Sequence, residues 1–194
     1  KATIERATLL RSLSHVQSVV ERRNTIPILS NVLIDADAGG GVKVMATDLD
    51  LQVVETMTAA SVESGGAITV SAHLLFDIAR KLPDGSQVSL EMSENRMVVK
   101  AGRSRFQLPT LPRDDFPVIV EGELPTSFEL PARELAELID RTRFAISTEE
   151  TRYYLNGIFL HVSDESRPVL KAAATDGHRL ARYTIDRPEG AEGM

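Results

Sequence analysis

The feature of this 194-residue chain that most limits its fold is an internal repeat. Leu29-Ser30-Asn31-Val32-Leu33 has a counterpart in Leu155-Asn156-Gly157-Ile158-Phe159, 126 residues later. Ala46-Thr47-Asp48 has one in Ala174-Thr175-Asp176, 128 residues later, and Ala7 matches Ala132 at an offset of 125. Matches that keep their order while the offset grows slowly indicate a duplicated folding unit. One fold therefore has to serve both parts of the chain.

The first part of the chain predicts strands arranged around two amphipathic helices. Apolar residues at helical spacing, from Leu9 to Val20, predict a first helix that ends near residues 22–24. Residues 73–82 predict a second helix that stops at Pro83. The expected strands are residues 1–4, 32–35, 42–47, 51–59, 68–71, 88–92, 96–100 and 106–108. This order is typical of an α+β fold with both helices on one face of antiparallel sheets.

The second part of the chain repeats this order. Residues 112–125 are acidic and interrupted by prolines, as expected of a linker between domains. Residues 128–130 predict an opening strand. Leu135 begins the apolar stripe of a predicted helix. Residues 157–162 and 168–174 flank a polar turn and predict a hairpin.

The repeat also predicts the domain boundaries. The expected domains are residues 1–122, a complete unit, and residues 123–194, the first half of a second unit. Because a full copy needs about 125 residues, the second unit is expected to stop before its second helix and last strands.

Composition and charge narrow the class of protein. The chain has no Cys, so a disulfide framework is excluded. No apolar run approaches the roughly 18–20 residues of a membrane span, and no secretory signal pattern opens the chain. We therefore expect a soluble cytoplasmic protein. The net charge of −6 argues against a surface that binds nucleic acid everywhere, although residues 96–105 hold four basic residues and no acidic one.

One locus offers candidate functional side chains. The predicted hairpin brings Tyr154 and Leu155 at its entry close to His178, Arg179 and Leu180 at its exit. Asp176 and His178 form an Asp-x-His pattern that is compatible with acid–base chemistry, but no supporting catalytic motif accompanies it. None of the four His has metal-ligand spacing. The alternative is a tight Asp-Gly turn after a strand, which implies no chemistry.

Several motifs together resemble the bacterial DNA polymerase III sliding clamp, the beta subunit, over essentially the whole chain. The motifs are Pro27-Ile28-Leu29, Ala46-Thr47-Asp48-Leu49, Gly102-Arg103-Ser104-Arg105-Phe106, Thr110-Leu111-Pro112, Asp115-Phe116-Pro117, Arg152-Tyr153-Tyr154-Leu155-Asn156-Gly157 and Ala174-Thr175-Asp176-Gly177-His178-Arg179-Leu180. The family has three such domains, so the chain resembles the first and about half of the second. The resemblance implies a head-to-tail dimeric ring of six domains, with helices lining a central hole.

The resemblance also implies three groups of site residues. DNA contacts are expected at Arg23, Arg80, Tyr153 and Tyr154. A groove for partner peptides is expected to use Leu155, Thr175, Gly177, His178, Arg179 and Leu180. The subunit interface is expected to use Arg96, Arg103, Arg105, Phe106 and Leu108. Without the resemblance, the two tyrosines are equally compatible with packing at a sheet edge.

Two positions depart from the family. Glu149 is an acid where the family has a polar DNA contact, and Leu74 stands where the family often has a basic residue at the subunit interface. The first departure weakens a DNA role for Glu149, and the second removes one expected ion pair.

The function implied is that of a non-enzymatic processivity factor. Such a ring holds the polymerase on double-stranded DNA by topology, binds DNA without reading its sequence, and needs no cofactor, nucleotide or metal of its own. Its expected partners are DNA, the polymerase, the clamp loader and repair proteins, the last three through short linear peptides. The fragment by itself is expected to bind such peptides weakly or not at all. The alternative function is a peptide-binding interaction module that does not encircle DNA.

Overall fold

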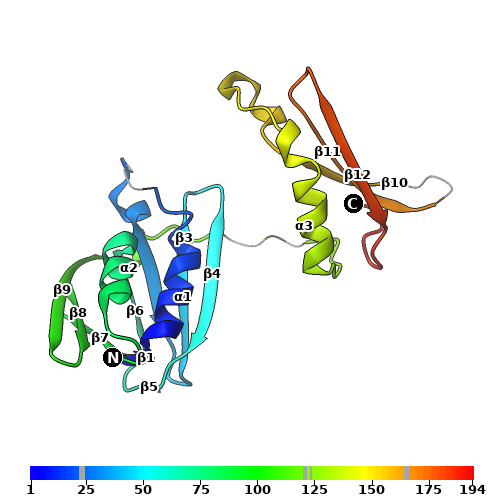
Figure 1. The fold of residues 1–194 in the computed structure, drawn as a ribbon. Coiled ribbons are helices and arrows are strands. Elements are labelled where there is room, and N and C mark those ends of the chain that lie inside the picture. Colours follow the sequence, from blue (N-terminus) through cyan, green and yellow to red (C-terminus); the bar gives the residue numbers. More distant parts are fainter. Residues whose placement is uncertain (22–24, 120–121, 123, 164–166) are drawn as a thin grey trace. The chain divides into compact units, whose positions relative to one another are not determined.

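A computed structural model of the chain describes residues 1–21, 25–119, 122, 124–163 and 167–194. These residues divide into two compact units, Lys1–Val120 and Glu121–Met194 (Figure 1). The expected boundary between residues 122 and 123 stays a prediction. No helix in the described part of the chain is both long enough and apolar enough to cross a membrane.

The first unit consists of two halves, each a strand, a helix and further strands. The first half contains β1 (Ala2–Glu5), α1 (Arg6–Val16), η1 (Pro27–Ser30), β2 (Asn31–Ala36), β3 (Gly41–Thr47), β4 (Gln52–Thr58) and β5 (Ser61–Val62). The second half contains β6 (Gly66–Ser71), α2 (Ala72–Lys81), β7 (Gln87–Ser93), β8 (Arg96–Ala101), β9 (Ser104–Leu111) and η2 (Arg113–Asp115). Within the described residues of this unit the predicted helices and strands are therefore present, and the two-residue β5 is the one strand that was not predicted.

The first strand of each half pairs with a strand of the other half. Strand β1 pairs with β7 of the second half, and β6 pairs with β2 of the first half. Among the described residues the sheet order is β4-β3-β2-β6-β9-β8-β7-β1-β5, with antiparallel pairing throughout. Helices α1 and α2 lie side by side on one face of this sheet, as the sequence predicts (Figure 1).

Both helices begin directly after a strand, and a side chain at the end of that strand caps each one. Glu5 accepts a hydrogen bond from the N–H of Thr8 (2.9 Å), and Ser71 accepts one from that of Leu74 (3.4 Å). Arg6 donates to the carbonyls of Ala79 (3.0 Å) and Arg80 (2.9 Å), which lie in the last turn of α2. The start of α1 is thereby tied to the end of α2.

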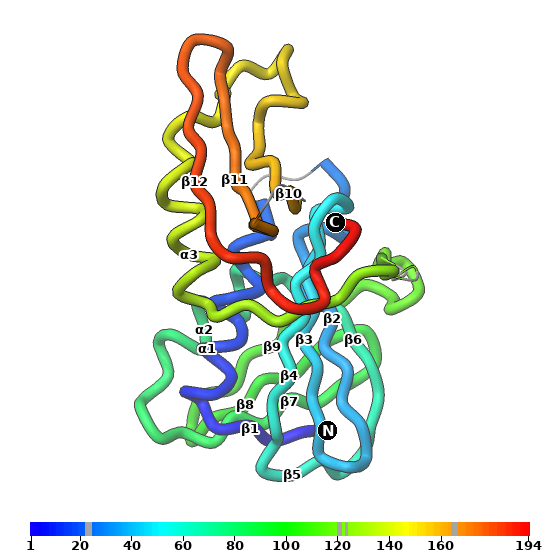
Figure 2. Tube along the Cα trace, turned by 90° about the vertical axis from the view of Figure 1, so that its right-hand side faces the viewer, coloured from blue at the N-terminus to red at the C-terminus, as the bar shows by residue number. Residues whose placement is uncertain are grey.

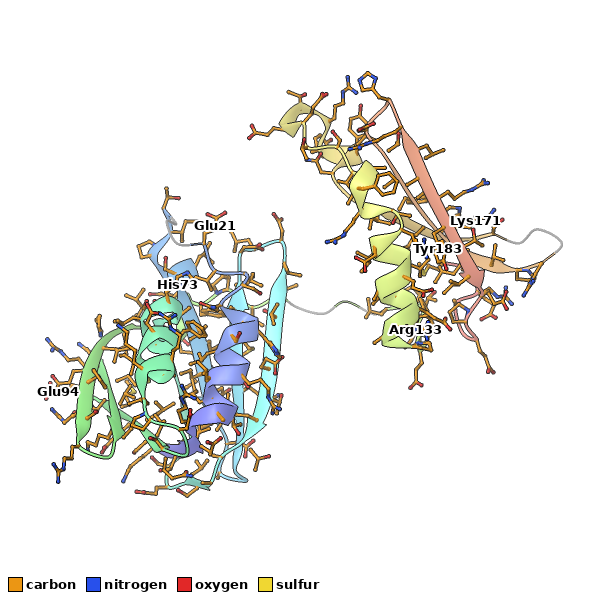
Figure 3. The ribbon with its side chains drawn as sticks, viewed as in Figure 1. Glu21, His73, Glu94, Arg133, Lys171 and Tyr183 are labelled. Carbon is orange, nitrogen blue, oxygen red and sulfur yellow. The ribbon has the colours of Figure 1, made fainter. Side chains whose placement is uncertain are left out.

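Helix α1 ends earlier than expected. It stops at Val16, and residues 17–20 form a turn instead, while residues 22–24 lie outside the described part of the chain. The Ser18 hydroxyl donates to the carbonyl of His15 (2.6 Å), and Val20 N–H bonds to the carbonyl of Gln17 (3.1 Å). These bonds compete with the helical pattern and close the turn. His73 Nε2 lies 3.0 Å from the carbonyl of Val20 and joins this turn to α2 (Figure 3).

The core of the first unit lies between the helices and the sheet. Leu9, Leu13 and Leu75 from the helices pack on the apolar side chains of the central strands, and all three are buried. A smaller cluster lies apart from this core, where Ile28, Leu29, Leu33 and Phe116 are buried together. Leu33 follows Val32 and precedes Ile34, which both face the main core, so the strand period of two places Leu33 on the opposite face.

The second unit packs one helix on a three-stranded sheet. Its elements are α3 (Ala132–Asp140), η3 (Arg143–Ala145), η4 (Glu150–Leu155), β10 (Phe159–Ser163), β11 (Val169–Thr175) and β12 (Leu180–Asp186). The predicted hairpin is confirmed as β10 and β11, whereas strand β12 was not predicted. Tyr183 of β12 donates to Glu137 Oε2 of α3 (3.2 Å) and so joins sheet and helix (Figure 3).

The strand predicted at residues 128–130 is wrong. Phe128 and Leu130 pack against the buried Leu138, Leu170 and Ala172, but these residues are not assigned to a strand. Alternation of apolar residues reports which side chains are buried, whereas a strand also needs a neighbouring backbone to pair with.

The duplication holds at the level of strand register. In the first unit Leu33 pairs with Met45 and Thr47 pairs with Gln52. In the second unit Phe159 pairs with Ala173 and Thr175 pairs with Leu180. The same offsets of 126 and 128 residues that relate the sequence motifs relate these pairs. The three strands β2-β3-β4 at one end of the first sheet and the three-stranded sheet β10-β11-β12 are therefore copies, and η1 and η4 precede them.

Even the turn after the second strand is repeated. Thr47 Oγ1 accepts from Leu49 N–H (3.0 Å), and Thr175 Oγ1 accepts from Gly177 N–H (3.0 Å). Leu49 has φ 84° and Gly177 has φ 88°, so both copies need a left-handed residue at the same point.

Candidate functional site

A groove in the second unit brings together part of the predicted peptide site. Its volume is about 370 Å³, and its lining is mostly apolar. The lining residues are Tyr154, Leu155, Gly157, Ile158, Phe159, Ala173, Ala174, Thr175 and Leu180, and this set is called the groove below. Figure 2 shows the turn that joins β11 to β12 at the upper end of the two strands. Next to this turn Thr175, the last residue of β11, pairs with Leu180, the first residue of β12. Of the six predicted residues, Leu155, Thr175 and Leu180 line the groove.

The other three predicted residues, Gly177, His178 and Arg179, form the exposed turn beside the groove. Asp176 organises this turn, since its Oδ1 accepts the backbone N–H groups of His178 and Arg179 (2.9 Å each). Its Oδ2 accepts from Nε of Arg179 (2.8 Å), and Thr175 Oγ1 donates to the carbonyl of Arg179 (2.7 Å). The turn is therefore preformed at the rim of the groove.

This geometry argues against acid–base chemistry at Asp176 and His178. The backbone N–H groups of Arg179 and His178, together with the Arg179 guanidinium, lower the pKa of Asp176 from 3.8 to about 2. A carboxylate with so low a pKa is a weak general base near neutral pH. Both of its oxygens are also engaged by the turn, so the Asp-x-His pattern is explained by local structure.

Arg152 connects η4 to the same turn. Its Nη1 donates to the carbonyl of Asp176 (3.3 Å), and its Nε lies 3.0 Å from Glu149 Oε2. A Cβ atom at Gly177 would lie 3.0 Å from Arg152 Nη1, so glycine leaves room for this contact. The two walls of the groove, η4 and the β11 end, are thus held together by one guanidinium.

The predicted DNA contacts lie on exposed surface where the structure describes them. Tyr153 and Tyr154 project from η4, with their rings edge to face at 5.9 Å between centroids. Arg80 stands at the end of α2, 3.1 Å from Asp77 and over the ring of Phe76. Arg23 lies outside the described residues. The DNA role of these residues stays a prediction.

The predicted subunit interface falls on β9 and its neighbours. Strand β9 pairs with β8 along residues 104–109, but with β6 only at Thr110 and Leu111. Phe106 is exposed, and so are Arg96, Arg103 and Arg105, whereas Leu108 is buried in the core of the first unit. Leu108 therefore supports this edge from within, and the interface stays a prediction.

Comparison with known proteins settles the family. A family model described as DNA polymerase III beta subunit, N-terminal domain, matches residues 1–120, and one described as its central domain matches residues 129–193. The chain belongs to the family of DNA polymerase III beta subunits. The resemblance noted in the sequence is thereby confirmed.

Individual members of the beta-subunit family match the whole chain. The beta sliding clamp of Caulobacter vibrioides is 54% identical over 197 residues, which cover 100% of this chain and 52% of the relative. A crystal structure of the sliding clamp from Bartonella birtlesii bound to griselimycin superposes with a TM-score of 0.95 at 52% identity, covering 100% of this chain and 51% of that one. The clamp structure from Caulobacter crescentus gives 0.94 at 54% identity, covering 98% and 52%. The chain spans about half the length of these relatives.

Sequence reasoning missed several groove residues. Gly157, Ile158, Phe159, Ala173 and Ala174 line the groove but were assigned only to strands. The sequence did contain a signal for these residues, because the repeat aligns Phe159, which is exposed, with Leu33. Apolar residues on both faces of a strand indicate that both faces contact other groups.

Proposed function

We propose that this chain is part of a sliding clamp, a processivity factor that encircles duplex DNA as a head-to-tail dimeric ring and catalyses no reaction. Membership of the beta-subunit family supports this proposal. The duplicated unit supports it as well, because rotationally repeated units can close into rings. The ring would keep the polymerase near the primer end and so raise its effective concentration there. No nucleotide or metal ion is needed for that role.

The apolar groove is the observation that carries the proposal for partner binding. Leu155 and Leu180 present apolar side chains beside the hydrogen-bonded turn of Asp176. Apolar walls with a few fixed polar groups suit the side chains of a short linear peptide. Such peptides would come from the polymerase, the clamp loader and repair proteins.

For DNA we propose contacts by Arg80, Tyr153 and Tyr154 that do not read sequence. Guanidinium and phenol groups donate hydrogen bonds to phosphate oxygens, and phenol rings stack on bases of any kind. Arg23 is proposed for the same role from its position in the sequence. Phe106 and the arginines around β9 are proposed to join subunits, and Leu108 to support that strand edge.

The test uses this chain within a protein of the length of its relatives. Leu155→Ala combined with Leu180→Ala should weaken binding of a fluorescently labelled polymerase peptide about 10-fold to 100-fold. Leu124→Ala, which removes an exposed leucine that does not line the groove, should leave binding unchanged. Fluorescence anisotropy measures both.

The ring itself is tested on DNA. A clamp loaded on closed circular duplex should stay bound and should slide off once the circle is cut. A protein that sediments as a monomer, binds the peptide and shows no difference between circular and cut DNA would instead be the interaction module.

A further inference from the structure

The duplicated sheet implies that the first unit has its own version of the groove. By strand register, Phe159 and Ala173 of the groove correspond to Leu33 and Met45, and by the offset of 126 residues Leu155 corresponds to Leu29. Tyr154 corresponds to Ile28 by the same offset of 126 residues. These four residues, Ile28, Leu29, Leu33 and Met45, are called the first-unit face below. They lie on the side of the sheet away from α1 and α2.

The first-unit face is covered, whereas the groove is open. Phe159 is 66% exposed, and its counterpart Leu33 is 1% exposed. The cover is Phe116, which is 4% exposed and packs with Ile28, Leu29 and Leu33, and with the partly buried Met45 and Ala67. Phe116 belongs to neither repeat motif but to the segment that follows β9.

The backbone of this segment directs Phe116 onto the face. Residues Arg113–Asp115 form the short helix η2, and Phe116 N–H donates to the carbonyl of Arg113 (2.9 Å). Pro117 then prevents further helix, because it fixes φ and lacks an N–H group. The segment continues across the sheet toward β4 (Figure 1).

A second contact fixes the other end of the segment. Ile119 N–H donates to Oε1 of Gln52 at the start of β4 (3.0 Å). The residue that corresponds to Gln52 in the second unit is Leu180, which lines the groove. An amide at this position can hold a passing backbone, whereas a leucine offers an apolar surface.

We propose that the first-unit face is a second peptide-binding groove, and that residues 115–119 of the same chain are its bound ligand. The site takes a short peptide whose aromatic side chain fills the place of Phe116. The contacts that form this site all lie within the first unit, so the site does not depend on whether the open groove binds a partner.

Tethering explains why the site is closed to other peptides. A ligand joined to its site by a short stretch of chain has an effective concentration in the millimolar range. A free peptide therefore competes poorly until the aromatic side chain is removed. Phe116→Ala should open the site, because alanine leaves most of the ring volume empty.

The experiment measures binding in trans to the whole 194-residue chain. The probe is a labelled synthetic peptide of residues 113–119, and the control peptide carries Ala in place of Phe116. The Phe116→Ala chain should bind the probe at least about 10-fold more tightly than the wild-type chain, and should bind the control peptide no better than the wild type does. The probe should also raise the Tm of Phe116→Ala and leave that of the wild type unchanged.

A folded Phe116→Ala chain that fails to bind the probe would overturn the proposal, since Phe116 would then be ordinary core packing. Should Phe116→Ala not fold, Phe116→Leu serves in its place, because leucine keeps the face covered in part. An independent measurement uses Gln52→Leu with Phe116 intact, which should speed hydrogen exchange at the Ile119 amide about 10-fold, while Gln107→Leu leaves it unchanged. If the Ile119 amide exchanged at the same rate in both variants, the hydrogen bond from Ile119 to Gln52 would be contradicted. The proposal that residues 115–119 are a bound ligand would then fail as well.

Discussion

At the scale of single residues, the fold favours the ionised form of the Asp176 carboxylate. Its pKa is lowered to about 2 from 3.8, chiefly by the backbone N–H groups of Arg179 and His178 and further by the Arg179 guanidinium. Since the folded-state pKa lies below the unfolded one, this stabilisation is complete above about pH 4 and is lost as the pH falls toward 2.

Two variants test that cause. Asp176→Asn should lower the Tm of the second unit at neutral pH, and the difference from wild type should shrink between pH 4 and pH 2. Arg179→Gln, which keeps both backbone donors, should raise the pKa of Asp176 only part of the way to 3.8. Carbon-detected NMR titration of the carboxyl group measures this pKa directly. A wild-type value near 3.8 would show that the turn does not form as described.

At the scale of elements, the turn that follows β3 is repeated after β11, and comparison of the two copies identifies Leu49 as a strained residue. Leu49 has φ 84° where the second copy has Gly177, and left-handed backbone costs a non-glycine residue about 1–2 kcal/mol. Leu49→Gly should therefore stabilise the first unit by about 0.5–1 kcal/mol, after the extra entropy of glycine in the unfolded chain is subtracted. Chemical denaturation monitored by circular dichroism measures this change.

Leu51→Gly is the matched control for that turn. Leu49 and Leu51 are 51% and 54% exposed, but Leu51 is not among the described residues with positive φ. Glycine at 51 relieves no strain and should destabilise the unit by about 0.5–1 kcal/mol. If both variants changed the free energy of unfolding equally, the change would come from lost side-chain contacts and not from the backbone conformation.

Most of the elements could be predicted because their patterns are local. The helical spacing from Leu9 and the short apolar run of residues 157–162 are both patterns of neighbouring residues, and both elements formed. The failures have non-local causes. Whether residues 128–130 form a strand depends on a partner strand, and the end of α1 depends on how Ser18 bonds to His15.

The site was predicted less completely than the fold, and for the same reason. Leu155 and Leu180 were found because the family motif contains them, whereas Phe159 and Ala173 enter the groove only through their register in the sheet. The covering of the first-unit face by Phe116 depends on a linker crossing a sheet, which no local pattern reports.

At the scale of the whole molecule, the two units differ in how much apolar surface they bury. The first has a continuous core beneath α1 and α2, whereas β10, β11 and β12 rest on two small clusters, around Leu138 and around Ala145. Stability follows buried apolar area, so the second unit should open at a lower free energy than the first. We expect two thermal transitions in calorimetry and faster hydrogen exchange in β10–β12 than in β7–β9.

One core variant in each unit assigns the transitions. Leu170→Ala should lower the temperature of the earlier transition only, and Leu75→Ala that of the later transition only. Each should reduce the free energy of unfolding of its own unit by about 2–4 kcal/mol, because both leucines are fully buried. Hydrogen exchange followed by mass spectrometry then identifies which strands open in each step. A single transition that both variants shift equally would mean that the units unfold together, in which case the free energy of each depends on the other and not on its own core alone.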